Sequence, residues 1–294
     1  MHELAKIPYI GCGIGLRSDI SDETFARSRE IDTVEIISDK FFSDRIARNI
    51  AYLEKAKSYF RVIPHGIKLS IGSASPIPEQ YLRDMKWLTD DVGAYYYSDH
   101  YALTHDDDML DIGHLSPLWF TKEMLAHVCS RVDQIQQFIG KPLVLENITA
   151  PFTIPEADYE EPEFISRVCE KTGCGLLLDV TNVFINAFNQ KKDAMQLVRQ
   201  YPLQNLVHIH LAGGEIHEGV FYDSHSQGIS GDNEGVWPLL EYVAMHANIR
   251  ALIIERDENF GEEFEDLVMK DLRRAKQIVE SSRLVGSARN SRGG

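Results

Sequence analysis

The chain has 294 residues and a formal net charge of −15, with 44% apolar and 26% charged residues. These proportions are ordinary for a globular protein. The negative charge argues against a nucleic-acid partner, because phosphate binding needs clustered Lys and Arg. No apolar run approaches the roughly 18 residues of a membrane span, and the N-terminal segment MHELAKIPYIG lacks the features of a secretory signal. We therefore expect a cytoplasmic protein with no membrane contact.

Apolar runs and amphipathic segments alternate along the chain. The runs predict eight strands, at 8–16, 33–38, 59–66, 94–100, 142–147, 174–180, 205–212 and 250–256. The intervening segments predict helices at 21–29, 78–92, 121–140, 161–173, 233–247 and 262–282. This alternation favours a parallel α/β architecture, and eight units favour a closed (β/α)8 barrel over an open sheet.

The barrel is expected to form a single domain over residues 1–283, followed by a disordered tail at 284–294 that has no apolar period. Two connections, 101–117 and 213–232, are longer than a barrel needs, and long loops at the top of a barrel usually hold substrate. Their histidines, His105, His114 and His217, are interpreted as surface or substrate-proximal residues. The four cysteines show no metal-binding spacing and are expected to be reduced structural thiols.

Six of the predicted strands end on a side chain that can bind a metal. These are His65, His100, Glu146, Asp179, His210 and Glu255. The ends of parallel strands meet at one face of a barrel, so the six side chains are expected to converge there. Nitrogen and oxygen ligands without cysteine indicate a multinuclear centre for borderline-to-hard metals.

Each strand-end residue also has a purely structural interpretation. Taken singly, His65 or His100 could be a hydrogen-bonded core histidine. Glu146 and Glu255 end aliphatic runs, and a buried carboxylate requires a counter-charge. The basic candidates nearby are few, Arg17 and Arg256, so metal ions are the more economical counter-charge.

Further candidates stand close to the strand ends. Asn182 lies three residues after Asp179, on the same side of the first turn if a helix starts there, although Asp179 could simply cap that helix. Asp223 and His225 form a D-x-H pair in a loop. His208 shares a strand face with His210, but only His210 is near enough to the strand end, so His208 is expected one layer down as a satisfied core histidine.

The ordered set GIGLR, HGIKLSIG, SDH, LVLENI, LLLDVTNV, HLAG, D-x-H and a final ER resembles the multinuclear non-haem iron-dependent oxidative enzymes of peptide natural-product biosynthesis (MbnB/TglH-like). The resemblance runs in order from about residue 8 to about residue 280. It implies a (β/α)8 barrel similar to xylose isomerase, with two or three irons, mixed Fe(II)/Fe(III), at its top. It also implies O2 as co-substrate and a cysteine of a ribosomally made precursor peptide as the target.

By position, the resemblance implies a metal-binding set in which Glu146, Asp179 and His210 are also catalytic. The complete set is His65, His100, Glu146, Asp179, Asn182, His210, Asp223, His225 and Glu255. Family members often carry a histidine directly after the glycine of HLAG, where this chain has Gly214. Without a histidine at position 214, no imidazole from this position can contact a third iron. The difference indicates a subgroup with a distinct substrate.

The family generally works with a small partner protein that captures the peptide leader, so a heterodimer is expected. Leu115, Trp119 and Phe120 could contribute to that contact, or could instead pack the helix that follows. The alternatives for function are a Mn- or Mg-dependent sugar isomerase or epimerase, an endonuclease IV-like three-zinc phosphodiesterase, and a metal-storage or scaffold protein. The His-rich ligand set disfavours the first and the acidic charge disfavours the second.

Overall fold

The computed structural model describes residues 2–42, 47–105, 110–257 and 264–290. Its centre is a closed barrel of parallel strands in the order β1-β12-β9-β8-β7-β4-β3-β2, in which β1 pairs with both β12 and β2. All eight predicted strands are present, and the predicted (β/α)8 barrel is confirmed. The barrel strands are β1 Gly11–Gly15, β2 Thr33–Ile37, β3 Arg61–His65, β4 Tyr97–His100, β7 Leu143–Glu146, β8 Gly175–Asp179, β9 Leu206–Leu211 and β12 Ala251–Ile254.

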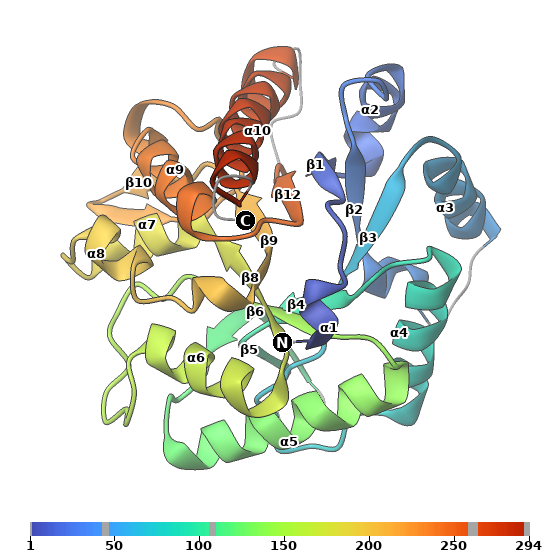
Figure 1. Cartoon of the computed structure of the whole chain (residues 1–294). Helices are drawn as coiled ribbons and strands as arrows, with labels where there is room; N and C mark the ends of the chain where they lie inside the picture. The colour runs from blue at the N-terminus through green and yellow to red at the C-terminus, as the bar shows by residue number, and fades with distance from the viewer. Residues whose placement is uncertain (1, 43–46, 106–109, 258–263, 291–294) are drawn as a thin grey trace.

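Helices surround the barrel in Figure 1. The helix α5 shows why they form: its buried residues recur at three- and four-residue steps, Thr121 caps its N-terminus by accepting a hydrogen bond from Met124 N, and the left-handed Gly140 ends it. The α-helices are α1 His2–Ala5, α2 Ser21–Ala26, α3 Ala47–Tyr59, α4 Glu79–Asp91, α5 Lys122–Ile139, α6 Glu161–Thr172, α7 Val180–Asn189, α8 Ala194–Val198, α9 Val236–His246 and α10 Lys270–Asn290. Single turns are η1 Ser18–Ile20, η2 Ser38–Phe41, η3 Leu203–Asn205, η4 Gly231–Asn233 and the π-helical η5 Phe264–Met269.

The barrel interior is an apolar core below and a polar layer above. The apolar part includes Ile63, Tyr96 and Leu177, together with Leu4 and Ile7 from the N-terminal segment. A larger core between the strands and the outer helices excludes water from the rest of the sheet. The upper ends of the strands are therefore held rigidly, which fixes the side chains that follow them.

The two long connections contain antiparallel hairpins that their sequence did not predict. Connection 101–117 folds as β5 Ala102–His105 with β6 Asp111–Pro117, and connection 213–232 contains β10 Glu215–His217 with β11 Val220–Tyr222. The strand β6 is largely exposed. Such a strand has no alternating apolar face, so periodicity could not reveal it.

The C-terminal helix extends further than the sequence indicated. The predicted segment 262–282 corresponds to η5 and α10, although residues 262 and 263 lie outside the described part of the chain. The helix α10 continues to Asn290, into the segment 284–294 for which the sequence predicted a disordered tail. Within the described ranges, no helix combines the length and apolar character needed to cross a membrane. The four cysteines are buried free thiols.

Candidate metal centre

The strand ends converge as predicted. His65, His100, Glu146, Asp179 and His210 are the last or nearly the last residues of β3, β4, β7, β8 and β9, and Glu255 directly follows β12. All six are buried. Parallel pairing places them at one end of the barrel, where neighbouring strands bring His100 opposite Glu146 and Asp179 opposite His210.

The first group consists of His65, His100 and Glu146. The Nε2 atoms of His65 and His100 lie 3.4 and 3.3 Å from the same carboxylate oxygen, Glu146 Oε2. Ser98 Oγ donates to the carbonyl oxygen of Pro64 and therefore accepts from His65 Nδ1–H at 3.0 Å. The lone pair of His65 Nε2 thus faces an oxygen that has no hydrogen-bond partner. Two facing acceptors fit a cation bound between them.

The second group shares Glu146 with the first. His210 Nδ1 lies 3.1 Å from Glu146 Oε1 and 3.1 Å from Glu255 Oε2, and ligand atoms of Asp179 come within 4.8 Å of all three residues. One oxygen of Glu146 therefore faces each group. The arrangement is that of a carboxylate able to bridge two ions.

Asp179 caps a helix and also has an unpaired carboxylate oxygen, so both interpretations of its position in the sequence remain compatible with the structure. Its Oδ1 accepts from Asn182 N at 2.8 Å and caps α7, while its buried Oδ2 has no hydrogen-bond partner. Burial, followed by the Glu146 and Asp223 carboxylates, raises the pKa of Asp179 well above its usual range. One oxygen serves the fold, and the other remains available to a cation.

Asn182, Asp223 and His225 adjoin this second group. Asn182 Nδ2 donates to the carbonyl oxygen of Asn147 at 3.1 Å, which leaves its buried Oδ1 without a partner. His225 Nε2 and Asp223 Oδ1 lie 2.8 Å apart without hydrogen-bond geometry. His225 also has a left-handed backbone (φ 50°), a conformation that non-glycine residues rarely adopt and that often occurs at functional sites.

Two charged residues, Arg17 and Asp257, contact the candidate ligands Glu255 and His225 and hold them in position. Arg17 Nε donates to Asp257 Oδ1 at 2.7 Å, and its guanidinium lies 3.7 Å from Glu255. Asp257 Oδ2 in turn lies 3.1 Å from His225 Nδ1. Gly15 makes room for this chain of contacts, because a Cβ there would come within 2.9 Å of the Arg17 guanidinium. The sequence identified Arg17 only as a nearby cation and did not identify Asp257.

The electrostatics of the site reflect its excess of carboxylates. Burial is the largest influence on His100 and lowers its pKa, but Glu146 and Asp99 more than offset it and raise the pKa to about 9. For His210, carboxylates likewise overcome burial and raise the pKa well above its usual range. Protons thus provide positive charge among these carboxylates. Bound cations would provide it instead.

Other histidines lie at the depth that the sequence predicted, but the surroundings of His208 differ from the prediction. His105 is partly exposed, and His114 and His217 are exposed, as expected for loop histidines. His208 lies one layer down, as expected, but it is not satisfied, because neither ring nitrogen has a hydrogen-bond partner. Glu35, which the sequence analysis missed, points into the same layer from the middle of β2. A carboxylate inside the apolar run TVEII was the available signal.

Gly214 is buried against its neighbours. Its amide donates to Asn233 Oδ1 at 2.9 Å, and a Cβ at this position would lie 2.3 Å from the carbonyl oxygen of Tyr222 and 2.9 Å from Phe221. No side chain fits here unless β11 moves. A metal contact from position 214 is therefore excluded in this backbone.

Sequence comparisons identify relatives over nearly the whole chain. A family model described as RiPP precursor modification enzyme MbnB/TglH/ChrH matches residues 11–280. A UPF0276 protein of Caulobacter vibrioides (strain NA1000 / CB15N) is 31% identical, covering 92% of this chain and 95% of the relative. A UPF0276 protein of Shewanella sediminis is 32% identical, covering 88% and 90%.

Solved structures with a similar fold include sugar epimerases, at low sequence identity. A D-tagatose 3-epimerase-like protein has a TM-score of 0.57 and 14% identity, covering 95% of this chain and 99% of its own. D-psicose 3-epimerase from Clostridium cellulolyticum H10 has a TM-score of 0.54 and 14% identity, covering 94% and 99%. At this identity the likeness concerns the fold alone. It confirms the expectation of a xylose-isomerase-like barrel.

Proposed function

This chain belongs to the MbnB/TglH/ChrH family of RiPP precursor modification enzymes, and we propose that it oxidises a cysteine residue of a ribosomally made precursor peptide, using bound iron and O2. One observation carries the proposal beyond family membership. Glu146, Asp179, Asn182, Asp223 and His225 each have a buried side-chain oxygen or nitrogen atom without a hydrogen-bond partner. Buried polar atoms are normally paired, so this pattern supports a multinuclear cation centre.

Two or three iron ions, mixed Fe(II)/Fe(III), are proposed to be held by the three adjoining groups. Bound iron would favour the thiolate form of a substrate cysteine and supply the redox centre for O2. The first ion would be held by His65, His100 and Glu146, and the second by Glu146, Asp179, His210 and Glu255. Asn182, Asp223 and His225, with Asp179, would hold a third.

Residues of the chain fix the positions of the candidate ligands and bury them away from water. Glu146 spans two groups and would therefore set the spacing between two bound ions. Arg17 contacts Glu255 and Asp257 contacts His225, which orients these two side chains. Glu146, Asp179 and His210 are proposed as the catalytic residues because each is buried where the groups meet. Preorganised ligands of this kind lower the reorganisation needed during reaction.

The peptide and a leader-binding partner protein are proposed to approach beside the β5–β6 hairpin. A groove there is lined mainly by apolar residues, among them Leu103, Ile112, Trp119, Phe152 and Ile154. Its lining residues belong to the connections that follow β4 and β7, whose ends carry His100 and Glu146. Trp119 is 54% exposed and Phe152 is 56% exposed, and because both line this groove they contribute to one contiguous apolar surface.

The direct test is turnover of a cysteine-containing precursor peptide. The protein, co-expressed with the product of the adjacent gene, would be purified anaerobically, loaded with Fe(II), and exposed to O2 with the peptide. We expect a mass change on the peptide that is absent from a Cys→Ser peptide and from the Glu146→Gln protein. Sugar epimerisation by a Mn-loaded protein, with an unmodified peptide in the iron-loaded reaction, would contradict the proposal and favour the alternative activity.

A further inference from the structure

His208 is a buried imidazole that the proposed iron centre does not use. It lies on β9 two residues before His210, so both side chains point into the barrel. Its register neighbours are Leu177 and Ala251, which belong to the apolar interior core. His208 is fully buried, and neither Nδ1 nor Nε2 has a hydrogen-bond partner. A histidine in this environment would ordinarily be replaced by an apolar residue or given a partner.

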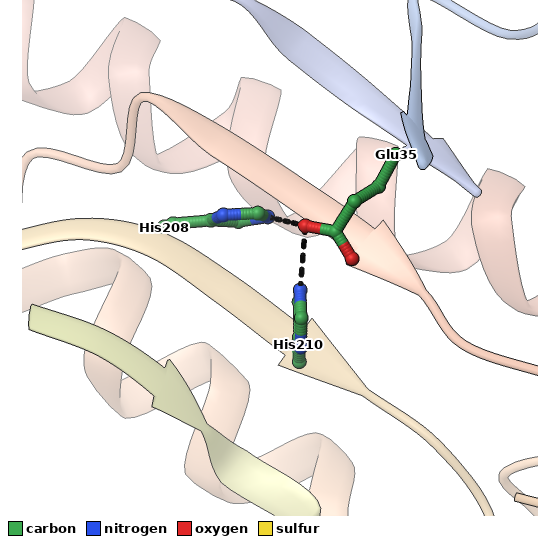
Figure 2. Close-up of side chains that lie close together, drawn as sticks. All are labelled: Glu35, His208 and His210. Atoms are coloured by element: carbon green, nitrogen blue, oxygen red, sulfur yellow. Dashed lines mark hydrogen bonds and ion pairs between the residues drawn. The ribbon is translucent and has the colours of Figure 1, made fainter. Parts of the chain in front are cut away.

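Glu35 reaches the same point from β2, on the other side of the barrel. Its Oε2 lies 3.1 Å from His210 Nε2 and 3.7 Å from His208 Nε2. Figure 2 shows both rings directed at this single oxygen. Glu35 is buried as well, with 1% of its surface exposed. Among the described residues, these three side chains form a compact group whose ligand atoms all lie within 4.8 Å of one another.

We propose that Glu35 Oε2, His208 Nε2 and His210 Nε2 bind an additional transition-metal dication of the Zn2+ or Fe2+ class, one layer below the iron centre. Two imidazoles and one carboxylate suit these metals better than Mg2+ or Ca2+, which prefer oxygen ligands. Bonds of about 2.0–2.1 Å at tetrahedral angles place ligand atoms about 3.3–3.4 Å apart. The two observed separations of 3.1 and 3.7 Å bracket that value.

A hydrogen bond alone does not account for the group. If His210 Nε2–H donates to Glu35, the carboxylate fixes the ring so that Nδ1 is free for the upper ions, as a supporting carboxylate commonly does. That arrangement explains Glu35 and His210 but leaves both nitrogens of His208 unsatisfied. A cation among the three residues satisfies His208 Nε2 and the negative charge of Glu35 together.

The site would connect to the upper centre through His210. The Nδ1 of His210 faces Glu146 and Glu255, while its Nε2 faces Glu35. With ions on both sides, His210 would bridge as an imidazolate, and the protons of both ring nitrogens would be released to solvent. Only this bridging rests on the proposed function. The lower site itself stands on Glu35, His208 and the orphaned nitrogens.

Two near-isosteric variants test the site through metal content. His208→Phe and Glu35→Gln would be loaded anaerobically with Fe(II) or with Zn2+, desalted and analysed for metal per chain. Each is expected to bind one ion fewer than the unsubstituted protein. The matched control is His127→Phe, which removes a histidine that lies outside all the ligand groups and contacts the carbonyl oxygen of Ser73; it should keep the full count.

Stability and crystallography provide independent readouts. Metal-free His208→Phe should melt no lower than the metal-free parent, because phenylalanine needs no hydrogen bond, and it should gain less from added Zn2+. Anomalous scattering from crystals of the metal-loaded parent should show a peak about 2.0–2.2 Å from the three ligand atoms. Unchanged metal counts in folded Glu35→Gln and His208→Phe, or no such peak, would overturn the proposal. Occupancy of this site without peptide oxidation would instead overturn the proposed function and leave this inference standing.

Discussion

At the scale of single residues, Asp179 combines an observed structural role with the ligand role proposed for it. One of its oxygens caps α7 and the other is unsatisfied beside Glu146 and Asp223. The sequence suggested a cap or a ligand, because both roles favour aspartate at the end of a strand. Only the structure shows that one carboxylate can serve both roles.

The two roles of Asp179 can be separated by substitution. Asp179→Asn should retain a capping oxygen and lower the metal content by at least one ion per chain. Asp179→Ala should lose the same metal and, in the metal-free state, also about 1 kcal/mol of stability relative to Asp179→Asn because the cap is gone. Metal analysis and urea unfolding measure the two effects, and full metal occupancy in both variants would remove Asp179 from the site.

How far the sequence predicts the site depends on where each residue lies on its strand. Strand-end residues such as His65 and Glu255 interrupt apolar runs just before a loop, so they were identifiable. Glu35 lies inside a strand, and nothing in its neighbours indicates that it faces a histidine across the barrel. Likewise, the missing partner of His208 is a property of packing that a strand pattern cannot reveal.

At the scale of elements, the sequence predicted the barrel strands but not the hairpins in the long connections between them. Strands such as β8 and β12 are apolar because both faces are buried. The hairpin β5–β6 lies outside the barrel, and the exposure of β6 removes the alternation that would identify a strand. The residues suggested for the partner contact, Leu115, Trp119 and Phe120, differ in their exposure. Phe120 is buried with its ring 5.0 Å from that of Phe164, whereas Trp119 is exposed.

The exposed apolar groove beside this hairpin predicts a site-specific effect on partner binding. Trp119→Asp should abolish co-elution with the leader-binding partner in gel filtration while leaving the melting temperature unchanged, because Trp119 already faces solvent. Met245→Asp on α9 is the matched control, since Met245 is also exposed but lies on a different element. If the isolated chain turns over the peptide as fast as the co-purified complex, the partner proposal is wrong.

The start of α10 contains a buried carboxylate with a pH-dependent cost. Asp271 accepts from Ile229 N at 2.7 Å, and burial raises its pKa to about 6 although Lys270, Arg274 and Arg256 oppose the shift. Between its usual pKa and about 6 the folded state binds more protons than the unfolded state, so this residue's contribution to stability falls as pH rises through that window.

Asp271→Asn should remove that pH dependence. The difference in unfolding free energy between variant and parent should shift in favour of the variant from pH 4 to pH 7, by at most about 3 kcal/mol, and remain constant above that range. Urea unfolding at several pH values measures it, and comparison with the parent cancels other groups that titrate. A difference that does not change with pH would show that Asp271 keeps its ordinary pKa in the folded protein.

For the whole molecule, the barrel concentrates negative charge at one end. Glu146, Asp179 and Glu255 are buried within one group, and the chain as a whole is strongly acidic. Metal removal should therefore lower stability, because the carboxylates then repel one another or must take up protons. A ligand at about a thousand times its Kd adds about 4 kcal/mol per site. Chelation followed by thermal unfolding should show a lower Tm, restored by Fe(II); an unchanged Tm would argue against a buried cation centre.

Anaerobic purification followed by metal analysis directly measures the identity and number of ions in the strand-end centre. The parent should contain at least two irons per chain. Because Glu146 faces two groups at once, Glu146→Gln should lose more than one ion while its circular dichroism remains unchanged. Manganese or zinc alone in the parent, or an iron content that Glu146→Gln does not alter, would contradict the multinuclear iron centre.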